Sequence, residues 1–181
     1  MPGPAFIEGE SVELRTIEEE DIAFMQTVIN DREIWRAIGR PSPVNRAQER
    51  EFFDEVVSGD EQLTLMIVAE DQPVGMVSLT PGGENHSAEL GYWVAPEHQR
   101  KGYGSAGVTH TLTHGFNQQR YHRVAARVFA FNEASQGLLE SLGFQREGRH
   151  REAAFVDGEY RDVLWYGLLA DEWDPDKSGR A

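Results

Sequence analysis

The chain has 181 residues and a formal net charge of −14 at pH 7, with 31 acidic residues against 17 lysines and arginines. Its length fits one compact domain, and its acidity argues against a nucleic-acid partner, because nucleic acids are bound through clusters of lysine and arginine. Cysteine is absent, which excludes disulfides and thiolate metal sites.

Neither end of the sequence predicts a membrane or export segment. No apolar run approaches the roughly 18 residues of a membrane span, and residues 1–10 lack the basic flank and apolar stretch of a secretory signal. We therefore expect a cytoplasmic protein without a membrane partner. Two explanations of the acidity stay open: attraction of a cationic substrate, and solubility, including solubility in a high-salt cytosol.

The first half of the chain predicts one strand, two helices and then three strands. A short strand is expected at 12–15, a helix opens on the acidic residues 18–21, and a second helix follows Pro43 and ends at Gly59. Beyond it the apolar residues form short runs rich in branched side chains, which is typical of strands. These strands are expected at 63–69, 74–79 and 88–94.

The second half alternates helices and strands and ends in a hairpin. A helix is expected at 102–119, a strand at 124–129, a helix from Asn132 to Gly143, and final strands at 149–156 and 161–168. The whole order, β-α-α-β-β-β-α-β-α-β-β, predicts an α/β fold of the α+β kind. It would be one domain at 5–173, with a mixed, mostly antiparallel sheet of about seven strands, about four helices and flexible termini at 1–4 and 174–181.

The segment 99–105, Gln-Arg-Lys-Gly-Tyr-Gly-Ser, lies between a predicted strand and a predicted helix. Backbone amides and the helix dipole favour an anion at such a position. Gly102 and Gly104 let the backbone approach a ligand closely, while Arg100 and Lys101 add positive charge. The segment therefore predicts a phosphate site.

Three other interpretations of this segment are possible. Residues 102–107 satisfy G-x-G-x-x-G, but the dinucleotide fingerprint requires its glycines directly after the first strand of the fold. A Walker loop requires its lysine after the last glycine, whereas Lys101 precedes Gly102. A glycine-rich turn without a ligand is the remaining alternative, although it does not account for the two cations.

Residues 99–104 resemble the (Gln/Arg)-x-x-Gly-x-(Gly/Ala) pyrophosphate loop of the GCN5-related N-acetyltransferases, the GNAT family. The likeness covers about 12–173 and points to the ribosomal-protein alanine N-acetyltransferase branch, which is RimJ/RimL-like. It implies an acetyl-CoA-dependent N-acetyltransferase. The other segments that carry it are Ala88-Glu89-Leu90-Gly91-Tyr92-Trp93-Val94-Ala95-Pro96, Asn132-Glu133-Ala134-Ser135, Leu142-Gly143-Phe144 and Asp162-Val163-Leu164-Trp165-Tyr166.

The resemblance implies where acetyl-CoA binds. The pantetheine arm enters a gap between the strand before the loop and the strand after the following helix, and a backbone donor near Val94 polarises the thioester carbonyl. Asn132 adds a hydrogen bond to the pantetheine, or is an ordinary helix cap. The implied cofactor residues are Trp93, Val94, Ala95, Gln99, Arg100, Lys101, Gly102, Tyr103, Gly104, Ser105 and Asn132.

Two residues are candidates for the chemistry. Strand alternation places Glu89 beside the cofactor as a base, acting directly or through water; a solvent-facing carboxylate is the alternative. Many relatives use a tyrosine on the next helix to protonate the departing thiolate, but Leu139 stands there. The resemblance leaves Ser135 as donor, with water or Tyr92 as substitutes, and a purely structural serine as the alternative.

The acceptor is an amine whose class the sequence leaves open. At pH 7 an α-amine needs about 1.4 kcal/mol to lose its proton and a lysine-like amine about 4.6 kcal/mol, so a weak base suits a peptide or protein N-terminus. A polyamine or aminoglycoside-like amine, and a non-catalytic CoA-binding module, are the alternatives. His110 and His114 lack the partners of a metal site, so no metal is expected. A homodimer is compatible with the sequence.

Overall fold

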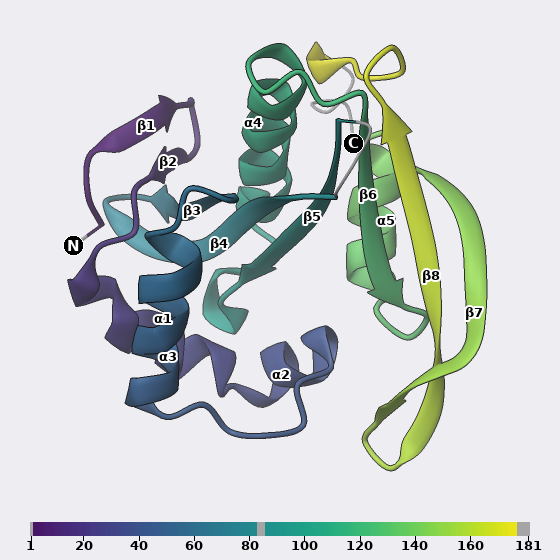
Figure 1. The fold of residues 1–181 in the computed structure, drawn as a ribbon, viewed down its shortest axis with the longest axis horizontal. Helices are drawn as coiled ribbons and strands as arrows, with labels where there is room; N and C mark the ends of the chain where they lie inside the picture. The colour runs from purple at the N-terminus through teal and green to yellow at the C-terminus, as the bar shows by residue number, and fades with distance from the viewer. Residues whose placement is uncertain (1, 83–85, 177–181) are drawn as a thin grey trace.

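The computed structural model describes residues 2–82 and 86–176. Within them the chain forms one sheet of eight strands in the order β1-β2-β3-β4-β5-β6-β8-β7 (Figure 1). Neighbouring strands are antiparallel except β5 and β6, which are parallel. The strands are β1 Ala5–Glu8, β2 Glu13–Arg15, β3 Leu63–Ala69, β4 Gln72–Pro81, β5 Ser87–Val94, β6 Arg123–Phe129, β7 Gln145–Val156 and β8 Glu159–Leu169.

Helices cover both faces of this sheet. One buried cluster joins α4 and α5 to residues such as Ile67 and Leu90, and a second joins α1 and α2 to residues such as Met66 and Trp93. Adjacent strand residues such as Met66 and Ile67 enter different clusters because strand side chains alternate between faces. The helices are α1 Ile22–Ile29, α2 Arg32–Ile38, α3 Arg46–Phe52, α4 Tyr103–Asn117 and α5 Glu133–Ser141.

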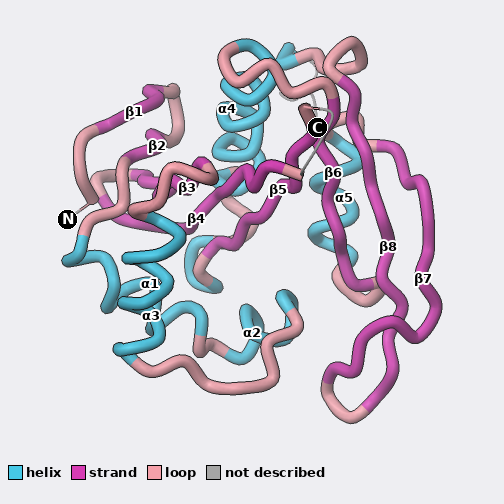
Figure 2. Tube along the Cα trace, in the orientation of Figure 1, coloured by secondary structure: helices cyan, strands magenta, loops and turns pink. Residues whose placement is uncertain are grey.

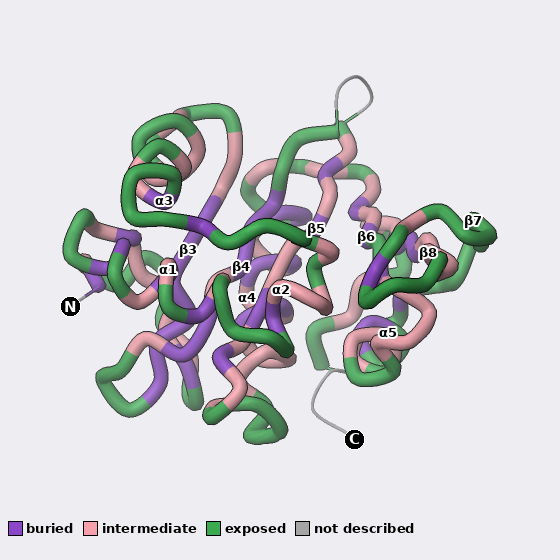
Figure 3. The backbone as a smooth tube through the Cα atoms, turned by 90° about the horizontal axis from the view of Figure 1, so that it is seen from below, coloured by how far each residue is buried: buried purple, intermediate pink, exposed green. Residues whose placement is uncertain are grey.

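The parallel pair β5 and β6 is joined over a short stretch only. Their register runs from Ser87 opposite Arg123 to Glu89 opposite Ala125, and beyond Glu89 the two strands diverge (Figures 1 and 2). Buried segments concentrate in the central strands, whereas much of β7 at the edge of the sheet is exposed (Figure 3). The splayed strands therefore open the sheet near its centre.

The expected fold class is confirmed, with two additions. The described residues contain β1 and α2, which the sequence analysis did not predict, so the strands and helices exceed the expected about seven and about four. β1 is only four residues long and follows a Pro-Gly-Pro segment, which hides a strand pattern. α2 has seven residues, too few for a clear helical period.

Local signals nevertheless explain α2. The side chain of Asp31 accepts a hydrogen bond from the backbone of Glu33 and caps the helix start. Gly39 ends the helix with φ of 74°, and a Cβ atom there would lie 2.5 Å from Cζ of Phe129. Glycine thus serves both the left-handed turn and the close approach of α2 to β6.

The N-terminal residues are tied to the body of the protein. The Gly3 N–H donates to the Thr16 carbonyl at 3.0 Å, and the Thr16 N–H donates to the Pro4 carbonyl at 3.2 Å. Residue 1 and residues 177–181, which the sequence analysis included in flexible termini, lie outside the described residues. None of the described helices has the length and apolar character needed to cross a membrane.

Candidate active site

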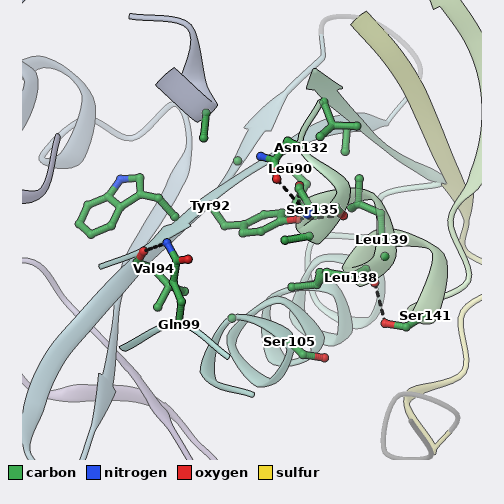
Figure 4. Close-up of a pocket in the computed structure, with 18 of the residues that line it drawn as sticks. Leu90, Tyr92, Val94, Gln99, Ser105, Asn132, Ser135, Leu138, Leu139 and Ser141 are labelled. Carbon is green, nitrogen blue, oxygen red and sulfur yellow. Dashed lines mark hydrogen bonds between the residues drawn. The ribbon is translucent and has the colours of Figure 1, made fainter. Parts of the chain in front are cut away.

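A large cavity occupies the opening between β5 and β6. Its volume is about 1920 Å³, and it is lined by the open halves of both strands, the loop before α4, the start of α5 and one side of α2. Figure 4 shows residues of this cavity, with Tyr92 reaching from β5 toward Ser135 on α5. The cavity therefore extends from the loop 99–105 on one side of the sheet to α2 on the other side.

The loop before α4 presents backbone amides to the cavity. Gly102 stands at the N-cap with φ of 84°, and among the described residues no side chain caps the helix start. The first helical hydrogen bond runs from the Ala106 N–H to the Gly102 carbonyl at 3.0 Å, which leaves the amides before Ala106 for a ligand. Arg100 lies in the same loop. This arrangement suits a diphosphate.

The open edge of β5 offers further backbone groups. The Ala95 N–H donates to the Val74 carbonyl at 2.9 Å, so the backbone of Ala95 faces β4. Backbone groups of successive strand residues point to opposite edges, which turns Trp93 toward β4 as well and Val94 toward the gap. In agreement, the side chain of Gln99 donates to the Val94 carbonyl at 3.1 Å (Figure 4). Val94 is therefore the strand residue of these three whose backbone faces the gap.

Glu89 lies where the pairing of β5 with β6 ends. Its Oε1 accepts from Nε of Arg127 at 2.7 Å, and the side chain is 40% exposed. Glu89, Gly91 and Trp93 share the face of β5 that α1 and α2 cover, and Trp93 packs there against Phe24 at a ring distance of 6.0 Å. A Cβ atom on Gly91 would lie 2.9 Å from Oγ of Ser78, so glycine at this position leaves room for the neighbouring β4 side chain.

Asn132 and Ser135 form the start of α5. The Asn132 side chain accepts from the Ser135 N–H at 3.1 Å, which makes Asn132 the N-cap. The Ser135 hydroxyl lies 2.6 Å from the Tyr92 hydroxyl (Figure 4). Leu139, one turn later, is 1% exposed and has no polar atom. Ser135 and Tyr92 therefore place two hydroxyl groups in contact at this wall, whereas the hydroxyl of Ser141, further along α5, donates to the Leu138 carbonyl.

Tyr92 keeps its proton at neutral pH. Burial raises the pKa of Tyr92 to about 12, although the hydrogen bond to Ser135 lowers it. Tyr92 lies on the α4 and α5 face of β5, opposite to Glu89. The candidate base and the hydroxyl groups thus stand on opposite faces of the opened sheet.

The far side of the cavity is made by α2 and the β7–β8 hairpin. Arg36 of α2 forms an ion pair with Asp157 in the hairpin turn, with 2.9 Å between Nε and Oδ2. The Arg36 guanidinium also lies 4.9 Å from the centre of the Phe131 ring, and Phe131 stacks on Phe129 at 5.3 Å. Ion pairs and aromatic contacts therefore fix this wall.

The cavity brings together most of the residues expected from the sequence, but not all. Ala95 is fully buried and Lys101 is exposed, and neither contributes to the lining. The sequence analysis did not predict the part played by Arg127, whose contact with Glu89 joins two strands, or by α2, whose seven residues are too few for a clear helical period. The expected residues that do line the cavity are Glu89, Trp93, Val94, Gln99, Arg100, Gly102, Tyr103, Gly104, Ser105, Asn132 and Ser135.

The two histidines of α4 serve the packing of the N-terminal hairpin. His114 packs edge-on against Phe6 at 5.1 Å, and a Cβ atom on Gly9 would lie 2.1 Å from Nε2 of His110. Burial lowers the pKa of both histidines. Among the described residues, no group of three or more His, Asp or Glu side chains is arranged to hold a metal ion.

The fold and the cavity define an acetyl-CoA-dependent N-acetyltransferase. Residues 11–145 match the family model described as an acetyltransferase (GNAT) domain. Because this match covers more than half of the chain, the protein belongs to the GNAT acetyltransferase family, as its motifs predicted.

Relatives of the chain differ in the acceptors that their names give. The putative ribosomal N-acetyltransferase YdaF of Bacillus subtilis is 36% identical over 104 residues, a match that spans 57% of each chain. The spermidine N(1)-acetyltransferase of Vibrio cholerae is 27% identical over 162 residues, 88% of this chain and 94% of that one. The Vibrio cholerae spermidine N-acetyltransferase with CoA and spermine has the same fold, with a TM-score of 0.84, 24% identity, and coverage of 91% and 98%.

Proposed function

We propose that this enzyme acetylates the N-terminal α-amine of a peptide or protein. The supporting observation is the charge of the acceptor wall. Arg36 and Arg127 line the cavity there and form ion pairs with Asp157 and Glu89, and Glu33 of α2 lines the same cavity. The carbonyl groups of a peptide accept hydrogen bonds from guanidinium groups, so these two arginines favour a peptide acceptor.

Glu89 is the proposed base. Its ion pair with Arg127 uses Oε1, so Oε2 is the atom that would accept a proton from the amine or from a bridging water. Removing the proton of an α-amine at pH 7 requires about 1.4 kcal/mol, against about 4.6 kcal/mol for an amine of the lysine type. A carboxylate that is already paired with an arginine, as Glu89 is, is sufficient to deprotonate an α-amine.

The proposed reaction is a direct transfer in a ternary complex. The amine nitrogen attacks the thioester carbonyl, the C–N bond forms, the C–S bond breaks, and the sulfur keeps the electron pair. An ammonium acceptor loses two protons during the reaction. Glu89 or water takes the first proton before the attack, and the second equals the proton that the sulfur of CoA gains. The Val94 N–H would stabilise the developing oxyanion, and Ser135 would donate to the sulfur.

The opposite placement of the two candidate groups supports this order of events. Glu89 faces the α1 and α2 side, and Ser135 belongs to the α5 side. An amine would enter beside Glu89 and the thiolate would leave beside Ser135, so that attack and departure use different faces. The sequence contains no cysteine that could carry the acetyl group as a thioester.

A small-amine acetyltransferase is the second candidate. The similarity to a spermidine N(1)-acetyltransferase over most of both chains favours it, as does the net charge of −14. Cofactor binding would be the same in either case. The acceptor alone separates the two.

An acceptor panel separates the candidates. Purified protein is incubated with acetyl-CoA and one acceptor: a peptide with a free N-terminus, the same peptide with a blocked N-terminus and an internal lysine, spermidine, or an aminoglycoside. Mass spectrometry then records acetylation. We expect acetylation of the free N-terminus at the highest kcat/KM. Acetylation of spermidine alone would replace the proposal by the second candidate.

We also propose a domain at 5–173, a cytoplasmic location and a homodimer. The domain boundaries of 5–173 predict that a chain trimmed to these residues folds and binds CoA. A cytoplasmic location is to be checked by fractionation. Homodimer formation is to be checked by light scattering of the full chain.

A further inference from the structure

A tyrosine on β5 contacts the candidate donor on α5. The hydroxyl of Tyr92 lies 2.6 Å from Oγ of Ser135 and 3.5 Å from the Ser135 carbonyl oxygen. The first distance is that of a strong O–H···O hydrogen bond, and the second is too long for one. In Figure 4 the Tyr92 ring crosses the cavity from β5 toward α5. This side chain joins the two walls beyond the last paired residue of β5 and β6.

The direction of this hydrogen bond follows from the chemistry of the two groups. Either hydroxyl can donate in principle. A phenol is a stronger acid than an alcohol and therefore the better donor, and Tyr92 stays protonated at neutral pH because burial raises its pKa. When Tyr92 donates to Oγ, the hydrogen of Ser135 is free to point elsewhere in the cavity.

Two contacts then determine the geometry of Ser135. Asn132 accepts from the Ser135 N–H and fixes its backbone at the first turn of α5, while Tyr92 fixes the hydroxyl oxygen. Leu139, one turn later, is buried and apolar and offers no competing partner. The serine is thus held at both its backbone and its side chain.

We infer that Tyr92 is a positioning residue for acetyl transfer: it donates to Oγ of Ser135 and directs the serine hydrogen toward the thioester sulfur. This inference rests on the proposed role of Ser135 as donor. As the C–S bond breaks, the electron pair stays on sulfur and the serine proton moves to it. Ser135 then takes the proton of Tyr92 along their hydrogen bond, and Tyr92 recovers a proton from water after the products leave.

A double-mutant cycle tests this role. Tyr92→Phe, Ser135→Ala and the double variant are assayed with the best acceptor of the panel, and Tyr121→Phe serves as the matched control. Tyr121 is a half-buried tyrosine outside the cavity lining. We expect kcat to fall roughly tenfold for Tyr92→Phe and further for Ser135→Ala, with KM for acetyl-CoA unchanged. The double variant should match Ser135→Ala, because Tyr92 acts through Ser135.

Additive losses in the double variant, or full kcat for Tyr92→Phe, would overturn the inference. Full activity of Ser135→Ala would overturn it as well, since the group to be positioned would have no role. All these results leave the proposed function intact as long as the wild-type protein acetylates N-terminal amines. Failure of the wild-type protein with every acceptor would contradict the proposed function itself.

A second measurement keeps the test valid if Tyr92→Phe does not fold. 3-Fluorotyrosine introduced at position 92 preserves the shape of the side chain but gives a more acidic phenol. If the phenol must donate to Ser135, the alkaline limb of the kcat profile moves to lower pH. A purely structural tyrosine would leave that limb unchanged, and this result would overturn the inference.

Discussion

The two sides of the cavity are built by different means. On the proposed cofactor side, backbone amides before α4 and the open edge of β5 face the cavity, and the loop geometry depends on Gly102. On the acceptor side, side chains of α2, β6 and the β7–β8 hairpin form the wall, and pairs such as Arg36 with Asp157 hold it. The cofactor side thus depends mainly on one loop, whereas the acceptor side depends on side chains that only the folded chain brings together.

This difference explains why the cofactor is easier to infer than the acceptor. A backbone site needs glycines at fixed positions of one loop and therefore leaves a motif in the sequence. A wall of side chains from distant elements can change one residue at a time without changing the fold. The relatives agree with this, because one is named for a ribosomal acceptor and another for spermidine.

The largest expected effect is on the acceptor side. Glu89→Gln keeps the size of the side chain but removes the proposed base, so kcat should fall roughly 10²-fold to 10⁴-fold. Affinity for CoA, measured by calorimetry, should not change. Glu20→Gln, at an exposed position outside the cavity lining, is the control. Equal losses of CoA affinity and kcat would show that Glu89 belongs to both sides and would break the comparison.

The next effect is on the cofactor side. Gly102→Ala introduces a Cβ at φ of 84°, where no atom lies within 4 Å, so the cost is strain alone. Strain of about 1–2 kcal/mol predicts that the Kd for CoA rises about tenfold. Gly158→Ala introduces the same backbone strain at φ of 80° in the hairpin turn. This control variant should have a lower free energy of unfolding and an unchanged Kd for CoA. Identical CoA affinities for both variants would contradict a backbone-built site.

A smaller effect is expected from opening the acceptor wall. Asp157→Asn weakens the ion pair with Arg36 and is compatible with φ of 55° at this turn, because asparagine tolerates the left-handed region. Pairs of this kind contribute up to about 1 kcal/mol, so KM for the acceptor should rise about threefold at an unchanged Kd for CoA. An altered Kd for CoA would show that the two sides are not independent.

The last effect concerns stability and lies outside the cavity lining, on α3, which packs against α1. Glu49 on α3 is 6% exposed, and burial raises the pKa of its carboxyl group, although Arg40 opposes this. The folded protein thus binds the Glu49 proton more tightly than the unfolded chain, and this carboxyl group contributes less stability as the pH rises through and above 4.5.

Glu49→Gln should therefore raise the free energy of unfolding at pH 7 by about 1 kcal/mol, or Tm by about 2–4 °C. The gain should disappear below pH 4.5, where the carboxyl group is protonated in both states. Thermal unfolding at several pH values measures it. A destabilised variant at pH 7 would indicate that the ionised carboxylate has a compensating partner.

Local patterns were sufficient for most of the fold and for the cofactor loop. The period of apolar residues located β3 to β6 and α4. The glycines of 99–105 predict a diphosphate site at the loop before α4, where the structure leaves backbone amides uncapped. The pattern did not reveal α2, because its seven residues gain their stability from the Asp31 cap and from packing against Phe129. Tertiary contacts, not propensity, decide such short elements.

The candidate site shows the same limit. Alternation along β5 placed Glu89 correctly beside Gly91 and Trp93 on one face. It did not reveal that Arg127, 38 positions away, would pair with Glu89, since this contact depends on the parallel register of β5 and β6. Alternation also did not distinguish the backbone direction of Val94 from that of Ala95. The backbone of Val94 faces the gap, whereas the backbone of Ala95 is hydrogen-bonded to β4.

The most direct test of the account is a crystal structure of the protein with bound CoA. We expect the diphosphate against the backbone amides of Gly102 to Ser105, and the pantetheine between β5 and β6 with its thiol end near Val94 and Ser135. CoA bound at any other surface, or a gap that stays closed to CoA at saturating concentration, would contradict the account.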